Sequence, residues 1–249
     1  MPVRRAKKDF NEADMYKPVK DFFTGLGYAV NAEVLGIDIC LRKDGVLTVI
    51  ELKKSLNMTL LCQAVDRQSV TSQVYVAVPR PRHPHSRENE LARRIVKRLG
   101  LGLIYVKMDS ALKGVEIAHF PPAEVKTASK KRRERVVKEI EGRTVDVNTG
   151  GQTKKPIATA YRERAVKTAC ALEKGGALTV RELRGEYDCD PSVSYILRNN
   201  HYGWFERVSV EGRNIRYGLS AKGIEMLLDE SAGGDFMELI KVYREEILD

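Results

Sequence analysis

The chain has little cysteine, and the four it has are not spaced to bind a metal. They are scattered through 249 residues, and no two form the Cys-x-x-Cys pair of a zinc knuckle. Cys40 and Cys62 stand in apolar surroundings, which predicts buried, unpaired thiols. Because cysteines are few and no signal peptide is recognisable, we expect a reducing compartment, the cytoplasm.

Long apolar runs and several well-known catalytic motifs are missing as well. No apolar stretch approaches the roughly 20 residues that span a bilayer, so we expect no membrane segment. The sequence has neither a Gly-rich phosphate loop of the Walker type nor a Gly-x-Ser-x-Gly elbow. His83 and His85 form a close pair, but no acid or cysteine accompanies them at a metal-binding spacing, so an exposed basic loop is expected there.

Positive charge is in excess. Lys and Arg number 43 against 34 Asp and Glu, which gives a formal net charge of +9. Such a surface favours polyanions, and nucleic acid is the leading partner class. A basic surface that only keeps the protein soluble explains the charge equally well. Sequence motifs are therefore needed to distinguish the two interpretations.

The first half of the chain predicts an α/β domain. Apolar residues recur with the helical period and with the strand period in turn. Asn11 is the expected N-cap of the first helix. This order favours a mixed β-sheet flanked by helices. The predicted helices are 11–26, 59–70 and 87–99, and the predicted strands are 28–34, 37–41, 46–52, 73–78 and 102–107.

The second half predicts a smaller unit of three helices and a β-hairpin. Thr179 is expected to cap the second helix, and the pair Asp190 and Pro191 to open the third. Strands 204–210 and 214–219 follow, and then a helix from Ser220. We expect an α/β domain at 9–125, a basic linker at 126–156 ending in TGGQTKKP, a winged-helix domain at 157–230 and a C-terminal helix at 231–249.

A hairpin in the first half gathers charged residues. Asp44 and Gly45 separate two strand-like runs, which is a strong signal for a two-residue turn. In that register Asp38 falls directly opposite Glu51, and Lys53 lies on the same face as Glu51. A three-residue loop would shift the register and offset the two acids.

Two facing carboxylates repel each other unless a cation lies between them. Hard oxygen ligands suit Mg²⁺ or Mn²⁺, which would polarise a phosphate and activate a bound water. Lys53 would orient that water or neutralise the developing charge. A structural ion pair at a sheet edge is the alternative, because Glu-x-Lys triplets are common.

These residues resemble the motif of the PD-(D/E)XK nuclease superfamily. The matching segments are GIDIC with Asp38, VIELKK with Glu51, Leu52 and Lys53, and the helix LLCQAVDRQ with Gln63. The N-terminal half, about residues 9–110, looks similar to an uncharacterised bacterial family of PD-(D/E)XK-type phosphodiesterases.

The resemblance implies a restriction-endonuclease-like core and Mg²⁺-dependent (or Mn²⁺-dependent) cleavage of phosphodiester bonds. By this pattern Asp38 and Glu51 bind the metal, the carbonyl of Leu52 adds a ligand and Lys53 assists the water. The residue before Asp38 is Ile37, whereas the P in the name PD-(D/E)XK denotes a proline at that position. This is a mild departure from the motif.

For three further residues, the sequence leaves more than one role open. Glu12 fits the extra acid that many members have, but Glu33 or Asp14 would supply the same charge. Gln63 orients substrate or water, or is simply a half-buried polar residue. Arg67 touches a phosphate, or pairs with Asp66 or an acid one turn away.

The C-terminal unit resembles winged-helix DNA-binding domains. Ile196, Leu197, Trp204 and Phe205 are expected in its core. A winged helix that docks on proteins is the alternative. By the resemblance, the residues that face DNA are Ser192, Ser194, Tyr195, Arg198 and Asn199 on the recognition helix and Arg213 and Arg216 on the wing.

The sequence therefore predicts a metal-dependent endonuclease or phosphodiesterase that acts on DNA. Duplex DNA is the expected substrate, and a winged-helix domain is expected to position it. The second hypothesis is a non-catalytic DNA-binding regulator with a nuclease-like scaffold. A homodimer stays open, because many nucleases of this type cut both strands as dimers.

Overall fold

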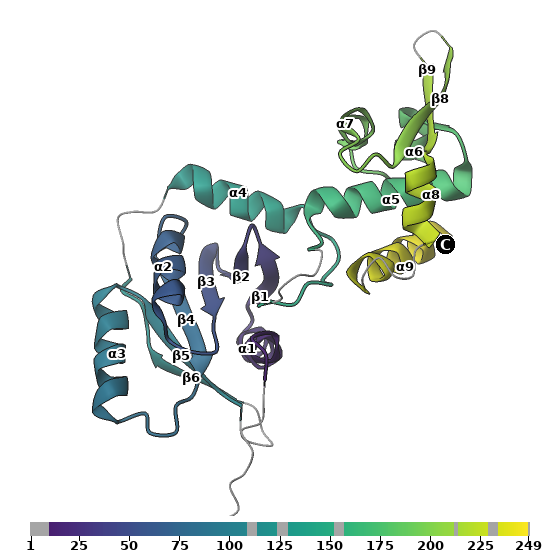
Figure 1. Ribbon diagram of the computed structural model, residues 1–249. Coiled ribbons are helices and arrows are strands. Elements are labelled where there is room, and N and C mark those ends of the chain that lie inside the picture. The colour runs from purple at the N-terminus through teal and green to yellow at the C-terminus, as the bar shows by residue number, and fades with distance from the viewer. Residues whose placement is uncertain are drawn as a thin grey trace, which may run out of the picture. The chain divides into compact units, whose positions relative to one another are not determined.

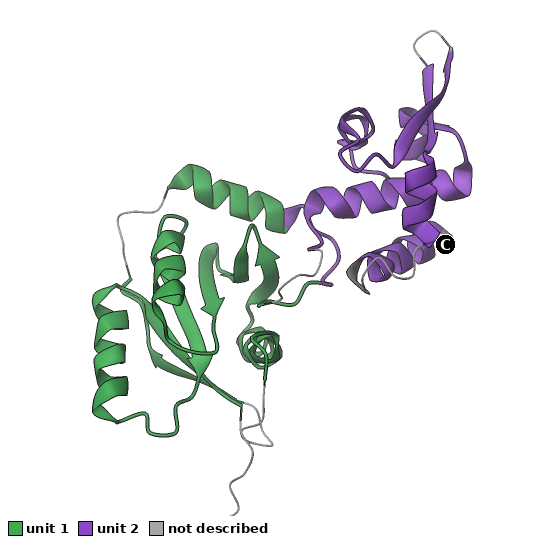
Figure 2. Cartoon of the chain, in the orientation of Figure 1, with its two compact units in different colours: residues 1–140, 148–153 green, residues 141–147, 154–249 purple. Residues whose placement is uncertain are grey.

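The computed structural model describes residues 10–108, 114–123, 129–151, 157–211, 214–228 and 234–248 (Figure 1). Its contacts divide the chain into two compact units (Figure 2). Unit 1 comprises residues 1–140 and 148–153, and unit 2 comprises residues 141–147 and 154–249.

Unit 1 is built on a six-stranded sheet whose strands follow one another in chain order. β3, β4 and β5 run parallel, and every other neighbouring pair is antiparallel. The predicted mixed sheet flanked by helices is therefore confirmed. The strands are β1 (Ala29–Val34), β2 (Ile37–Lys43), β3 (Val46–Leu52), β4 (Gln73–Pro79), β5 (Gly102–Lys107) and β6 (Gly114–His119).

Helices cover both faces of this sheet (Figure 1). α1 (Ala13–Gly25) packs on one face, whereas α2 (Met58–Arg67), α3 (Arg87–Arg98) and α4 (Lys130–Glu141) contribute to the apolar cluster on the other. Side chains alternate along β3, so Val49 packs with the α2 cluster and Ile50 with the α1 cluster. Glu51, two residues after Val49, consequently projects on the α2 side.

The predicted hairpin register between β2 and β3 is confirmed. Lys43 pairs with Val46, and the ladder continues to Ile39 opposite Ile50. The two turn residues, Asp44 and Gly45, have φ values of 50° and 74°. Positive φ at both central positions is the geometry of a type I′ turn, which matches the twist of the two strands. Continuing the register by one pair sets Asp38 opposite Glu51.

Some local predictions in unit 1 were wrong or incomplete. Asn11 is not the N-cap of α1: Glu12 holds that position without a side-chain cap, and the Asn11 backbone N–H donates to Asp14. Cys40 is buried as expected, but Cys62 is exposed because it lies on the outer side of α2.

The sequence pattern also missed two elements, β6 and α4. α4 is so rich in Lys and Arg that its buried Val136 and Ile140 give only a faint helical period.

The glycine pair of the expected linker folds back onto unit 1. A Cβ on Gly150 would lie 2.7 Å from the Asp38 carbonyl oxygen, and one on Gly151 would lie 3.1 Å from the Glu12 Cβ. The Gly151 backbone N–H donates to Glu33 over 2.8 Å. Only glycine allows so close an approach, so this segment packs beside the residues that flank the predicted site.

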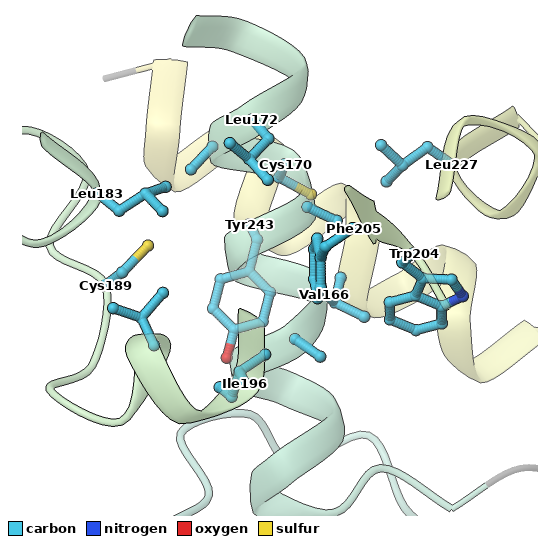
Figure 3. Close-up of a cluster of buried hydrophobic side chains, with 14 of the residues drawn as sticks. Val166, Cys170, Leu172, Leu183, Cys189, Ile196, Trp204, Phe205, Leu227 and Tyr243 are labelled. Atoms are coloured by element: carbon cyan, nitrogen blue, oxygen red, sulfur yellow. The ribbon is translucent and has the colours of Figure 1, made fainter. Parts of the chain in front are cut away.

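Unit 2 is a helical unit with a three-stranded sheet in the order β7-β9-β8. Trp204 and Phe205 lie in its core with Val166, Cys170 and Tyr243 (Figure 3). The predicted core positions are confirmed, Ile196 and Leu197 included. Its elements are α5 (Ala160–Gly175), β7 (Leu178–Thr179), α6 (Val180–Gly185), α7 (Val193–Asn199), β8 (Phe205–Glu211), β9 (Asn214–Leu219), α8 (Ala221–Leu228) and α9 (Gly234–Leu248).

Capping explains where two of these helices begin. Thr179 and Glu182 form the capping box of α6, as the sequence predicts for Thr179. The prediction that Asp190 and Pro191 open α7 was early by two residues. The Asp190 carboxylate accepts from the Ser192 backbone N–H over 2.7 Å, which makes a turn before the helix. The assignment of this unit as a winged helix stays a prediction.

Among the described residues, no helix has the length and apolarity required to cross a membrane.

Candidate active site

The two acids predicted to face each other lie together at the end of the hairpin. Asp38 Oδ2 accepts from the Leu52 backbone N–H over 2.7 Å, which fixes the half-buried carboxylate against β3. Glu51 is 1% exposed, and its Oε1 accepts from Arg67 Nε over 2.6 Å. Glu51 Oε2 is also buried but has no hydrogen-bond partner among the described residues.

Arg67 is part of this cluster. It lies at the end of α2, and its guanidinium also donates to the carbonyl of Gly36 in the β1–β2 turn. Asp66, the acid named as an alternative partner, lies 3.7 Å away, against 2.6 Å for Glu51. The structure pairs Arg67 with Glu51, a partner that the sequence did not predict. Gln63 lies half-buried on the same helix, one turn before Arg67.

Lys53 lies just beyond β3 and pairs with Glu12. Its Nζ is 3.2 Å from Glu12 Oε2, and the Lys54 backbone N–H donates to the other oxygen over 3.4 Å. Of the three acids considered for this place, Glu12 is the one in contact with Lys53. Asp14 instead accepts from the Asn11 backbone, and Glu33 accepts from Gly151.

Burial shifts both central carboxyl groups toward their protonated forms. Desolvation, followed by the negative charge of Asp38, raises the pKa of Glu51 to about 8, although Arg67 opposes the shift. Desolvation likewise raises the pKa of Asp38, against the hydrogen bond from Leu52 and the charge of Lys53. Burial therefore favours a proton or a further cation at this pair of acids.

The donor set fits a hard divalent cation through two carboxylates. Glu51 Oε2 is a buried oxygen acceptor without a partner in the segments that the structure describes, and oxygen ligands are those that Mg²⁺ and Mn²⁺ prefer. Within the described ranges, no group of three His, Cys, Asp or Glu side chains could hold a metal ion. A metal here would rely on Asp38, Glu51 and a backbone oxygen such as that of Leu52.

In unit 2, α7 presents most of the residues predicted to face DNA. Tyr195, Arg198 and Asn199 are exposed, Ser192 and Ser194 are half-buried, and Arg198 Nε donates to the Ser194 carbonyl over 3.1 Å. Val193 and the core residues on the opposite side of α7 are buried. The helix is therefore amphipathic, with a polar outer face.

The two wing residues are placed differently. Arg213 lies outside the described residues. Arg216 donates to the Ala177 carbonyl over 2.6 Å and to Glu182 over 3.0 Å. Its guanidinium is thus engaged within unit 2, between β9 and the start of α6.

The sequence missed the contact between Arg67 and Glu51. The available signal was weak: Gln63 and Arg67 are four residues apart, so they share one face of a predicted helix. Nothing in the local pattern showed that this face would meet the end of β3.

Comparison with known proteins gives one match. Residues 104–226 match the model of a family described as "Putative PD-(D/E)XK phosphodiesterase (DUF2161)". The match covers just under half of the chain and spans parts of both units, and Asp38, Glu51 and Lys53 lie outside it. No curated protein and no solved structure matches the chain. The chain is thus similar to a family whose description suggests a nuclease-like phosphodiester hydrolase, and its mixed sheet flanked by helices fits such a fold.

The raised pKa of Glu51 predicts a stability that falls with pH. With a chelator present, the folded state keeps this proton up to about pH 8, whereas the unfolded chain loses it near the ordinary value of 4.5. Folding stability should therefore fall between these values, by at most about 1.4 kcal/mol per pH unit, and level off above them. Urea denaturation should show this slope in the wild type and a flatter one in Glu51→Gln. Equal slopes would contradict the assignment.

Proposed function

We propose that this chain is a metal-dependent phosphodiesterase that cleaves DNA, and that unit 2 positions the duplex. The observation that carries the proposal is the pair of facing carboxylates, Asp38 and Glu51, with a buried Glu51 oxygen that accepts no hydrogen bond from the described part of the chain. Lys53 lies beside them, since its charge acts on Asp38. The family match to phosphodiesterases supports the same class of reaction.

Each residue of the proposed site has its own role in the reaction. A bound Mg²⁺ or Mn²⁺ would polarise the phosphate and lower the pKa of a water. Asp38, held by the Leu52 N–H, and Glu51, held by Arg67, supply fixed oxygen ligands, so little reorganisation is required on binding. Lys53 orients the attacking water or neutralises charge on the phosphate once substrate draws it from Glu12.

Unit 2 supports a role in DNA binding through α7. Its outer face offers Tyr195, Arg198 and Asn199, which are side-chain types that contact phosphates and base edges. The order of helices followed by the β8–β9 hairpin is that of a winged helix, in which such a helix enters the major groove. Arg216 is left out of this proposed surface because it is bound within the unit.

The basic helix α4 supports a further, sequence-independent contribution. Lys130, Lys131 and Arg135 are exposed on it, whereas Arg133 donates to the Gly45 carbonyl. Exposed cations in a row attract phosphates and release counterions, so their contribution weakens with salt.

A non-catalytic DNA-binding protein is the second candidate, and a specific observation favours it. Both cations of the site already have internal partners: Arg67 pairs with Glu51, and Lys53 pairs with Glu12. A scaffold that has lost catalysis would retain such pairs for stability. Cleavage assays separate the two candidates.

The first prediction from this proposal is that Lys53→Met abolishes most cleavage of DNA. Incubation with plasmid, linear duplex and single-stranded DNA in Mg²⁺ or Mn²⁺ should give cleavage by the wild type. Loss of the Lys53 ammonium should reduce the rate by about 100-fold or more, as for other positioned charges. Gel analysis of the products measures the rates.

Lys54→Met is the matched control, because it removes the same charge from the next residue in the chain. It should keep most of the activity. Cleavage that persists in both Lys53→Met and Glu51→Gln would rule out this site. Binding of DNA without cleavage of any substrate by the wild type, in either metal, would favour the scaffold candidate.

The second prediction concerns the outer face of α7. Arg198→Ala should weaken duplex binding about tenfold and reduce the slope of log affinity against log salt by about one, as expected for a lost phosphate contact. Fluorescence anisotropy at several salt concentrations measures both quantities. Lys241→Ala, which removes an exposed cation from α9, is the control and should change neither. Equal effects of the two variants would remove α7 from the proposed surface.

A further inference from the structure

A cavity of about 310 Å³ lies in unit 1, where it is lined by α3 and by the end of β6. The volume is at the lower end of the roughly 300–1,000 Å³ range of pockets that hold small molecules. Of the five lining side chains, three are permanently cationic, one is a histidine and one is an acid. They are Arg93, Arg94, Lys97, His119 and Glu90.

This cavity is separate from the candidate active site. β6 is an edge strand of the sheet, three strands away from β3. Glu51 is opposite Val76, Val76 is opposite Leu103, and Leu103 is opposite His119. With strands spaced by about 4.8 Å, this row sets the backbones of Glu51 and His119 about 14 Å apart. One phosphate group cannot reach both places, so a ligand of this cavity does not depend on the proposed cleavage.

The cations of the lining lack counter-charges. Within the described ranges, Arg93, Arg94 and Lys97 form no ion pair. Arg93 and Lys97 are four residues apart on α3, a spacing at which like charges face each other and repel. Three cations against the one acid in the lining, Glu90, leave a net charge of +2 while His119 is neutral. An anion in the cavity would relieve this repulsion.

His119 adds a group whose charge responds to an anion. The ring is half-buried, and its Nε2 lies 2.9 Å from the Leu101 carbonyl oxygen. Because a carbonyl only accepts, Nε2 carries the proton of the neutral ring and Nδ1 has none. Burial lowers the pKa of His119, the hydrogen bond to Leu101 opposes the shift, and the charges of Arg93 and Lys97 lower it further. An anion that offsets these two cations would favour a second proton, on Nδ1.

We propose that this cavity binds a dianionic phosphate group, either inorganic phosphate or the phosphate monoester of a small sugar. Phosphate oxygens accept the charge-assisted hydrogen bonds that Arg and Lys donate. The charge of a monoester approaches −2 above neutral pH, which balances the net charge of the lining. A phosphate diester, as in the backbone of a nucleic acid, carries one negative charge and leaves part of the lining unbalanced.

Calorimetric titration of the full chain at pH 8, without DNA, tests the proposal with ribose 5-phosphate, inorganic phosphate, dimethyl phosphate and ribose. Ribose 5-phosphate should bind once per chain, and ribose should not bind. Arg93→Gln and Arg94→Gln should each weaken the binding by about tenfold or more, because each removes a charged donor. Arg98→Gln is the matched control for Arg94→Gln: both residues are exposed on α3, but Arg98 is outside the lining and its loss should change little.

The His119 ring gives a second readout, which needs no variant. An anion beside the ring stabilises its protonated form, so a saturating phosphate ligand should raise the pKa of His119 by about half a unit or more. Nuclear magnetic resonance of the histidine rings at a series of pH values measures this shift. His201, in unit 2, is the internal reference and should keep its pKa.

Tighter binding of ribose 5-phosphate than of inorganic phosphate would assign the ligand to a sugar monoester, and equal or weaker binding would assign it to inorganic phosphate. Failure of both to bind, or an unchanged His119 pKa at saturation, would overturn the proposal. Equal losses in Arg94→Gln and Arg98→Gln would also overturn it. So would dimethyl phosphate binding as tightly as ribose 5-phosphate, which would make the cavity part of a general surface for diesters.

Discussion

The turn formed by Asp44 and Gly45 is the constraint on which the candidate site depends. A two-residue turn with positive φ at both positions admits one register between β2 and β3, and that register brings Asp38 opposite Glu51. A slip by one residue would move one of the acids to the opposite face of the sheet. The turn itself is distant from the two acids, but it determines whether they meet.

Once the acids meet, their burial determines the rest of the local electrostatics. Glu51 and Asp38 cannot both hold a bare charge away from water, so the structure surrounds them with Arg67, the Leu52 N–H and Lys53. A divalent cation would complete this arrangement through Glu51 Oε2.

Local signals were sufficient for much of the fold. The Asp-Gly turn, the alternation of β3 and the capping box at Thr179 depend on neighbours within a few residues, and each could be predicted from sequence. The places of α4 and of the Gly150 segment could not be predicted from local signals, because they depend on contacts with distant residues of unit 1. The contact of Arg67 with Glu51 also depends on residues that are distant in sequence, because it joins a helix to the end of a strand sixteen residues earlier.

The central claim is that Asp38 and Glu51 bind one divalent cation together. A titration with Mn²⁺, followed by electron paramagnetic resonance, tests it on the wild type, Asp38→Asn, Glu51→Gln and the double variant. If both carboxylates hold the same ion, each single variant should lose at least about tenfold in affinity, or 1.4 kcal/mol, and the double variant should lose clearly less than the sum. Strictly additive losses, or equal Mn²⁺ affinity in all four proteins, would contradict the account.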